Sequence, residues 1–354
     1  MKAICAAVVL VLAVLLPTGT RADEDAAREA AVPHSLLHGF EDVTFRVTES
    51  DGSTNAAFGL GQFDLFFVSN LAPDISFLAE VIVELEHAGE TDVERMQIKY
   101  SRWDQANITI GRVHTAIGYW NTFYHHGKLL QPTVERPAAL AFEDHGGILP
   151  VHSVGAELSG RVEAGSWQLG YVTTVANGRA ASQHEVQAAT DANTDKAVGV
   201  RFSMVHGTDR EFEVGVSGYR DRLPPNALAF GRQGSIDQLI GAVHARFESW
   251  HWTLLGEAYV VRDRDRSSHE VATHRAGYAL AVLNLGAWKP YAGVDILDVD
   301  ARDAYFSHTP KVRTGLAGVR YDLNAFNALK LELRREKSAG VETNALALQT
   351  AFMF

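Results

Sequence analysis

The segment "ISFLAEVIVELEH", residues 75–87, alternates apolar and polar side chains along almost its whole length. Successive side chains of a β-strand point to opposite faces, so the pattern separates two sets of residues. One face would carry Ile75, Phe77, Ala79, Val81, Val83 and Leu85. The other would carry Ser76, Glu80, Glu84 and Glu86. The segment therefore predicts a strand with one apolar face and one charged face.

The same two-residue period recurs over the rest of the chain. It is clear in "VERMQIKYSR" (93–102), "GAELSGRVE" (155–163), "VGVRFSM" (198–204) and "LKLELRRE" (329–336). About sixteen such segments can be traced, and no segment of helical period interrupts them. They lie near 40–49, 59–69, 75–87, 92–102, 105–113, 151–163, 166–177, 195–206, 211–221, 235–248, 251–263, 272–285, 287–299, 312–323, 327–337 and 343–354. The predicted fold class is all-β, because an α/β or α+β plan would need helical segments.

An antiparallel β-barrel that spans a membrane explains the lengths and spacing of these segments. Strands of about 9 to 14 residues suit a tilted transmembrane path, and bacterial barrels have an even number of strands, joined alternately by short turns and longer loops. If the first connection, 50–58, is external, the short internal connections fall at 71–74, 103–104, 164–165, 207–209, 249–250, 286 and 324–326. The alternate set holds the long ones, at 114–150, 178–194, 222–234, 264–271 and 300–311, although two of its members, around Gly89 and Gly340, are also short. We therefore expect residues 40–354 to form a barrel with both chain ends in the periplasm.

The first residues indicate export. Lys2 precedes an apolar run from Ala3 to Leu16, and "TRA" at 20–22 offers a cleavage site between small residues. The run is shorter than the roughly 20 residues of a membrane-spanning helix, so we interpret 1–22 as a cleavable signal peptide. The single cysteine, Cys5, lies inside it, so the mature chain would have no disulfide and no thiolate. Residues 23–39 are expected to form a periplasmic lead-in.

The acidic charge argues against a nucleic-acid partner. The formal net charge is −11, and loss of the signal peptide with Lys2 and Arg21 would make it about −13. Nucleic-acid binding requires clustered Lys and Arg. After the signal peptide, no stretch approaches the roughly 18 consecutive apolar residues of a transmembrane helix, so a membrane role would have to use strands.

A soluble β-sandwich would show the same alternation, with the apolar faces buried between two sheets. Two features favour the membrane barrel. Aromatic residues lie near the ends of the segments, as in the interfacial girdles of membrane barrels. These residues are Trp103, Trp167, Trp250, Trp252, Trp288, Tyr100, Tyr278 and Tyr321. The chain also ends in "NALALQTAFMF" (344–354), whose alternating apolar residues finish at Phe354.

This last strand resembles the C-terminal signature of Gram-negative outer-membrane barrels, which their assembly machinery reads. The stretch "NITIGRVHTAIGYWN" (107–121) resembles the passage from strand to constriction loop in phosphate-selective and related porins. The resemblance implies a porin-like barrel that spans the mature chain. Those porins line their passage with arginine and lysine, whereas this chain is acidic, so phosphate selectivity is not expected here.

In a barrel of about sixteen strands, the connection 114–150 would be the third external loop. The resemblance to trimeric porins implies that this loop folds inward and narrows the channel. Its Gly and Pro residues suit compact turns, and its aromatic residues argue against disorder. The expected constriction residues are Trp120, Tyr124, His125, His126, Lys128, Glu135, Arg136, Glu143, Asp144 and His145.

The polar faces of the segments supply candidates for the channel wall. Alternation selects Glu80, Glu84, Arg95, Lys99, Arg112, Glu157, Arg161, Arg201, Lys330 and Arg334. Two interpretations stay open for these residues. They could be cross-strand ion pairs that pack a polar interior, or they could set up a transverse field that orients and filters solutes.

A metal or catalytic site has weaker support. "FEDH" at 142–145 groups two carboxylates with a histidine and is the one place where a bound ion would be sought. Adjacent residues such as His125 and His126 point apart in an extended chain. Neither an H-E-x-x-H spacing nor a G-x-S-x-G nucleophile elbow occurs. We expect no metal, no cofactor and no enzymatic activity.

The sequence thus predicts a passive diffusion channel for small hydrophilic solutes or ions in the outer membrane of a Gram-negative bacterium. The expected partners are membrane lipid, the diffusing solutes, the assembly machinery that reads Phe354, and two further copies in a homotrimer. The alternative is an occluded barrel with a specific binding or structural role.

Overall fold

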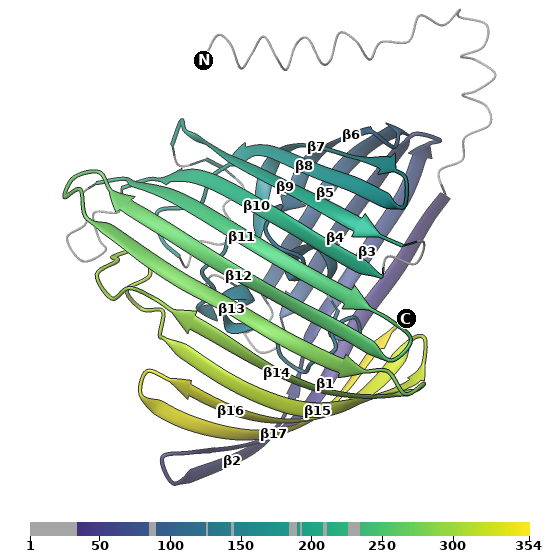
Figure 1. Ribbon diagram of the computed structural model, residues 1–354, viewed down its shortest axis with the longest axis vertical. Helices are drawn as coiled ribbons and strands as arrows, with labels where there is room; N and C mark the ends of the chain where they lie inside the picture. The colour runs from purple at the N-terminus through teal and green to yellow at the C-terminus, as the bar shows by residue number, and fades with distance from the viewer. Residues whose placement is uncertain are drawn as a thin grey trace, which may run out of the picture.

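The computed structural model describes residues 34–84, 90–124, 127–142, 145–183, 190–191, 193–207, 211–225 and 234–354, with only the backbone of Glu84 and Glu90. These residues form one antiparallel β-barrel (Figure 1). Within these ranges, no helix is both long enough and apolar enough to cross a membrane.

Seventeen strand segments are named along the described chain. They are β1 (His34–Ser50), β2 (Ser53–Leu60), β3 (Gln62–Ala72), β4 (Ile75–Glu84), β5 (Glu90–Trp103), β6 (Ala106–His114), β7 (His152–Ala164), β8 (Trp167–Asn177), β9 (Lys196–His206), β10 (Phe212–Leu223), β11 (Ile236–Glu248), β12 (Trp252–Asp265), β13 (Val271–Leu283), β14 (Trp288–Asp298), β15 (Val312–Asn324), β16 (Asn327–Ser338) and β17 (Val341–Met353).

The segments β2 and β3 share one position in the barrel. Both pair with β1, β2 along its second half and β3 along its first half, and only Gly61 separates them. The barrel is therefore closed and 16-stranded, as the sequence predicts. Gly61 lies tightly against the wall, because a Cβ added there would come within 1.9 Å of Asp42 Oδ1.

The barrel closes between its first and last strands. β1 pairs with β17 from Phe40 opposite Met353 to Ser50 opposite Thr343. At the end of the chain, the amides of Gly39 and Phe354 each donate to the other residue's carbonyl, at 2.9 and 3.0 Å. Pairing all round the barrel satisfies the backbone groups that an open sheet would expose at its edges.

The first strand is longer than predicted. β1 begins at His34, inside the predicted lead-in 23–39, because residues 34–40 pair with 64–70 of β3. The gap of residues 50–58 left between the first two predicted strands is also wrong, since Asp51 and Gly52 make a two-residue turn at positive φ of 49° and 76° before β2. The predicted signal peptide, 1–22, lies outside the described residues.

The connections separate into two rims, as predicted. One end of the barrel, here called the turn rim, carries the short connections such as Pro73–Asp74 and Ala325–Phe326. The other end, the loop rim, carries the long connections between β6 and β7, β8 and β9, and β14 and β15. Figure 1 shows the loops on the left and the chain end C on the right, at the turn rim.

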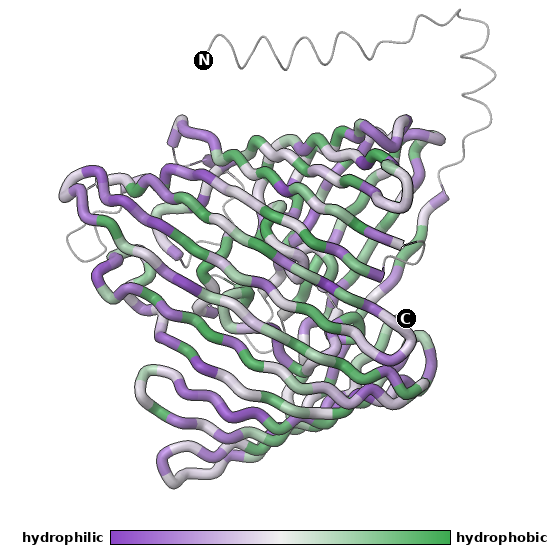
Figure 2. Tube along the Cα trace, in the orientation of Figure 1, coloured by the Kyte–Doolittle hydropathy of each residue, from purple (hydrophilic) through white to green (hydrophobic). Residues whose placement is uncertain are grey.

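The outer face of the wall is apolar. Large exposed side chains such as Val216, Val243, Val260, Ile296 and Leu333 alternate with buried neighbours. The tube in Figure 2 shows the corresponding alternation of apolar and polar residues along the strands. An apolar outer face of this kind suits contact with lipid.

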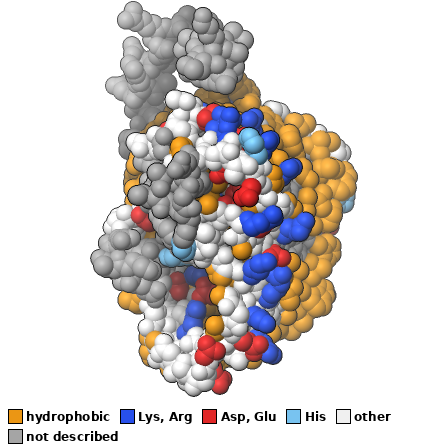
Figure 3. All heavy atoms as spheres, turned by 90° about the vertical axis from the view of Figure 1, so that its left-hand side faces the viewer, with side chains coloured by type: hydrophobic (Ala, Val, Ile, Leu, Met, Phe, Trp, Pro, Cys, Tyr) orange, Lys and Arg blue, Asp and Glu red, His pale blue; other side chains and the backbone are white. Residues whose placement is uncertain are grey.

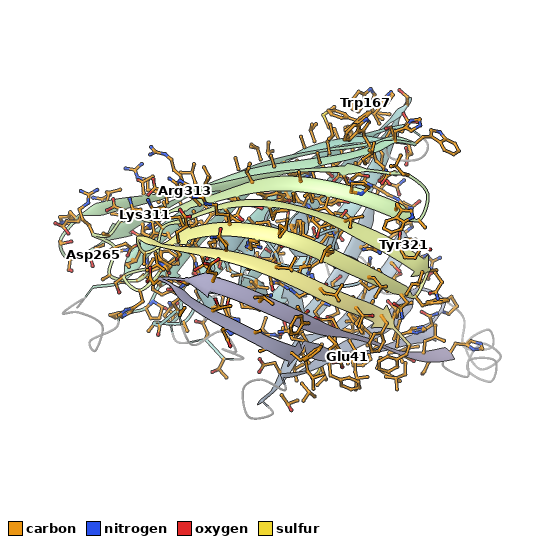
Figure 4. All side chains as sticks on the ribbon, turned by 90° about the horizontal axis from the view of Figure 1, so that it is seen from below. Glu41, Trp167, Asp265, Lys311, Arg313 and Tyr321 are labelled. Atoms are coloured by element: carbon orange, nitrogen blue, oxygen red, sulfur yellow. The ribbon has the colours of Figure 1, made fainter. Side chains whose placement is uncertain are left out.

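Aromatic residues line the turn rim. Trp103, Trp250, Trp252 and Trp288 are exposed there, and Figure 4 shows Trp167 and Tyr321 at the same end of the barrel. Tyr278 was expected in the same girdle, and this is wrong. It is buried inside the barrel, where its hydroxyl donates to Glu257 Oε1 at 2.5 Å.

Candidate pore site

The chain between β6 and β7 lies inside the barrel. Residues 115–151, here called the inner segment, contain the short helices α3 (Trp120–Phe123) and η1 (Ala138–Leu140). Its apolar side chains, including Ile117, Trp120 and Ile148, form one buried cluster with inner-wall residues from β9 to β15. This packing covers one side of the lumen.

One carboxylate of the wall holds the start of the inner segment. Glu257 on β12 accepts hydrogen bonds from the amides of Tyr119, at 2.6 Å, and Trp120, at 2.7 Å. Gly118 makes the close approach possible, since its φ is +71° and a Cβ there would come within 2.2 Å of Glu257 Oε2. From β9, the Arg201 guanidinium donates to the Gly118 carbonyl at 3.1 Å.

A second set of contacts joins the middle of the inner segment to β16. The buried Lys330 ammonium donates to the carbonyls of Lys128, at 2.6 Å, and Thr133, at 2.9 Å. Glu332 accepts from the Val134 amide at 2.9 Å. Charged groups with several partners resist rearrangement better than neutral ones, so these contacts fix the distance between segment and wall.

A cavity of about 830 Å³ separates the inner segment from the opposite wall. It is bounded by β1, β2, β16 and β17 and by residues 128–146 of the inner segment. Its charged and titratable lining residues are Asp42, Arg46, Lys128, Glu135, Arg136, His145, Arg334 and Glu336. Figure 3 looks onto the loop rim and shows a recess with acidic and basic side chains inside its lower part.

Ion pairs line the cavity, and one of them joins the wall to the inner segment. Arg46 on β1 pairs with Glu135, and Lys128 lies 3.2 Å from the other oxygen of that carboxylate. Burial alone would raise the pKa of Glu135, but the two cations lower it well below its ordinary value. Arg334 lies 3.6 Å from Asp295 and 3.5 Å from Glu336.

Arg136 brings a further positive charge to the same cavity. Burial lowers its pKa to about 10, against the opposing effects of Glu94 and Glu135. Its guanidinium lies 4.4 Å from the centroid of the Phe142 ring, a cation–π distance. Arg136 therefore remains charged at neutral pH.

The structure places the predicted constriction residues in three groups. Lys128, Glu135, Arg136 and His145 line the cavity. Trp120 and Tyr124 instead pack against the covered wall, with ring centroids 5.1 Å apart. The others lie outside the described residues, namely His125, His126, Glu143 and Asp144, and with them most of the FEDH cluster.

Of the predicted wall residues whose side chains the structure describes, Arg334 alone lines the cavity. Four others are engaged inside the barrel: Glu80 with Arg95, Lys330 with the inner segment, and Arg201 with Gly118. Glu157 and Lys99 are partly buried on the inner face of β7 and β5, and the exposed Arg161 lies 3.2 Å from Asp104 at the turn rim. The side chain of Glu84 is not among those described.

Two details of the predicted wall are wrong. Lys99 is opposite Ser76 and Glu84 is opposite Glu90, so the expected charge pairing across β4 and β5 is restricted to Glu80 and Arg95. Ser76 and Lys99 lie in the same register as Glu80 and Arg95, and a bulge between Glu80 and Val81 shifts the pairing only from Val81 onward. Arg112 does not line the cavity, because it is buried and donates to the Glu94 carbonyl at 3.1 Å.

Several lining residues were not selected from the sequence. Asp42, Thr44, Arg46 and Thr48 alternate along β1 and face the cavity. The two-residue period of "EDVTFRVTES" would have identified this face. The missed Glu336 follows Arg334 on the same face of β16.

A buried polar cluster near the loop rim was also missed. Asp263, His274 and Asp303 form a group of possible metal ligands in the described chain. The Asp300 amide donates to His274 Nδ1 at 3.1 Å, which leaves the ring proton on Nε2, 2.8 Å from Asp303. With this tautomer His274 serves as a hydrogen-bond donor to the β14–β15 loop and offers no free nitrogen to a metal.

Comparison with known proteins defines the fold class. The anion-selective porin from Comamonas acidovorans superimposes with a TM-score of 0.64 at 11% identity, over 91% of this chain and 100% of that chain. The outer membrane channel DcaP of Acinetobacter baumannii gives 0.63 at 12% identity, over 92% and 98%. A loop-deletion mutant of OmpT, an outer membrane protein of Vibrio cholerae, gives 0.62 at 10% identity, over 92% and 100%.

No protein-family model matches the chain, and no curated protein matches it. The likeness is therefore one of architecture. The chain has the fold of the outer-membrane porins, a closed 16-stranded antiparallel barrel, as its resemblance to that group implies.

Proposed function

We propose that the protein is an outer-membrane porin, a passive diffusion channel for small hydrophilic solutes or ions, with the inner segment as its constriction. The observation that carries this proposal is the cavity of about 830 Å³ between the inner segment and the wall of β1, β2, β16 and β17. Cavities of a few hundred to about 1,000 Å³ accommodate small organic molecules. Both signs of charge line the path, as in a transverse field across a water-filled passage.

The lining also suggests an ion preference. Among the lining residues that the structure describes, four basic side chains, Arg46, Lys128, Arg136 and Arg334, face three carboxylates, Asp42, Glu135 and Glu336, although the whole chain is acidic. A slight excess of positive charge favours anions in a narrow passage. We propose a weak preference for anions, and the fold shared with an anion-selective porin is consistent with it.

The membrane context completes the proposal. Export by the segment 1–22 and assembly through Phe354 would place the barrel in the outer membrane of a Gram-negative bacterium, with the loop rim outside. A related fold is described in a trimer form, for OmpT of Vibrio cholerae. We propose that three copies of this chain assemble in the same way.

Thiol accessibility tests which residues line the conducting path. In a Cys5→Ser background no other cysteine is present, so Thr44→Cys introduces a single thiol in the cavity. A water-soluble charged thiol reagent should then reduce the current through the reconstituted protein. Ser268→Cys, on the exposed loop between β12 and β13, is the matched control and should leave the current unchanged after labelling. Full labelling of Thr44→Cys with no loss of current would contradict the proposed path.

An occluded barrel is the second candidate, and one observation favours it. A second, separate cavity beside Phe40, Lys128 and Gln131 has a volume of only about 20 Å³, roughly the volume needed for one water molecule. A barrel closed at this level would bind a solute without conducting it. Conductance in a lipid bilayer distinguishes the two candidates.

A further inference from the structure

The outward faces of several strands end in basic residues at the loop rim. These residues, here called the basic belt, are Arg220 and Arg222 on β10, Arg262 and Arg264 on β12, Arg275 on β13, Lys311 and Arg313 at β15, and Arg335 and Lys337 on β16. Alternation fixes their direction. Val260 is exposed two residues before Arg262, and Leu333 two residues before Arg335, whereas the intervening Val261 is buried.

The belt is continuous with the apolar outer face of the barrel. Arg262 lies between Leu239 on β11 and Thr273 on β13, and Arg313 is directly opposite Lys337. In Figure 3 a row of basic side chains borders the apolar face, and Figure 4 shows Lys311 and Arg313 at the loop-rim end. The change from apolar to basic occurs within two residues along a strand, as from Val260 to Arg262.

Four carboxylates lie beside the belt. Asp237 pairs with Arg222, Asp298 with Lys311 and Glu342 with Arg335, each at 2.7 Å. Asp195 also lies 3.0 Å from Arg222, and Asp298 lies 3.7 Å from Arg313. Among the residues that the structure describes, Arg220, Arg262 and Arg264 form no ion pair within 4.0 Å. The nine cations of the belt therefore keep a clear excess over the carboxylates beside them.

The belt is limited to one sector of the barrel. On β1, β2, β8 and β9, the outward positions nearest the loop rim hold Glu49, Thr54, Asn177 and Lys196, with one cation among the four. Solvation of the rim requires charged side chains but does not require basic residues to gather on one side of it. The gathering stands out because the chain as a whole has a net charge of −11. The asymmetry points to a polyanionic partner next to β10–β16.

We propose that the basic belt binds a phosphorylated lipid of the outer leaflet. Arginine presents a planar fork of donors that matches phosphate, and seven of the nine belt residues are arginine. The apolar face directly below would contact the acyl chains of the same molecule. A soluble polyanion would use the charges alone, so the combined surface favours a lipid. The inference requires the barrel to lie in a membrane and does not require it to conduct.

The test uses purified full-length protein in detergent micelles with bisphosphorylated lipid A as the probe. The belt variant carries Arg262→Gln, Arg264→Gln and Arg313→Gln. Since each surface cation adds measurably to binding of an anionic lipid, the belt variant should bind at least about tenfold more weakly than the parent, as measured by native mass spectrometry over a lipid titration. Lipid A from which both phosphates are removed should bind the parent as weakly.

The control variant removes three other exposed cations, with Arg102→Gln, Lys196→Gln and Arg302→Gln. It should retain the parent affinity within about twofold, although it has lost the same net charge. Equal binding by the belt variant, or an equal loss in the control, would overturn the proposal. Complete displacement of lipid A by inorganic phosphate at matched ionic strength would also overturn the proposal, because that result would indicate a site for free phosphate.

Heat-modifiable gel migration establishes that each variant is folded. If the triple variant does not fold, the double variant with Arg262→Gln and Arg264→Gln replaces it.

Discussion

Glu135 lines the cavity and forms ion pairs with Arg46 of the wall and Lys128 of its own segment. Glu135→Gln would leave both cations unopposed, so we expect a higher anion preference, measured as a shift of reversal potential in a salt gradient. The loss of stability should be only about 0.5 to 1 kcal/mol, because side-chain exposures of 40% for Arg46 and 32% for Glu135 imply strong solvent screening. Glu270→Gln, on an exposed loop, is the charge-matched control. An unchanged reversal potential would remove Glu135 from the passage.

The titration of Glu135 predicts the pH dependence of the channel. Its pKa is lowered in the folded protein from an ordinary value of 4.5, so its ion pairs stabilise the constriction fully above that value and are lost as pH falls through the lowered pKa. We expect the Glu135-dependent part of the ion selectivity, obtained by comparing the parent with Glu135→Gln, to persist from pH 7 down to about pH 4. A loss of that difference already between pH 6 and pH 5 would contradict the lowered pKa.

The inner segment depends on a small number of anchors at the scale of a whole element. Glu257 accepts two amide hydrogen bonds from its start and one from the Tyr278 hydroxyl. Glu257→Ala should therefore free residues 117–124 and destabilise the protein by roughly 2 to 4 kcal/mol, since hydrogen bonds to a buried charge are worth more than neutral ones.

The release should appear as increased current noise and as faster proteolysis within the inner segment. Glu270→Ala is the control, because this carboxylate is exposed on the loop between β12 and β13. Proteolysis of Glu257→Ala at the parent rate would show that other contacts hold the segment.

The strands could be predicted from the sequence because alternation is a local property, and the turn-and-loop parity followed from it. The bulge at Glu80 could not be predicted from the sequence, because it depends on the pairing of β4 with β5. Nor could the anchors, since Tyr119 and Glu257 are 138 residues apart in the chain. The inner face was expected to be polar, yet Ile240 and Tyr259 lie there, because the inner segment covers them and keeps them from water.

At the scale of the whole molecule, the last residue completes the closure of the barrel, which the pairing of β1 with β17 makes. Phe354 exchanges two backbone hydrogen bonds with Gly39, and its ring stacks on Phe63 at 5.7 Å. Deletion of Phe354 should lower the yield of folded, heat-modifiable barrel in the membrane, while the molecules that do fold should conduct normally. Phe326→Ala, another exposed aromatic residue at the turn rim, should retain the parent yield. An unaltered yield after deletion would show that Phe354 is dispensable for assembly.

The proposed function requires that the cavity beside the inner segment conducts. The most direct test is the current through the purified full-length protein in a planar lipid bilayer, compared with a variant that lacks residues 120–145 but retains the barrel by heat-modifiable migration. We predict discrete conducting steps for the parent and larger steps for the deletion variant, because the deletion removes the constriction. A folded parent protein that gives no conducting steps at all would contradict the claim and establish the occluded barrel.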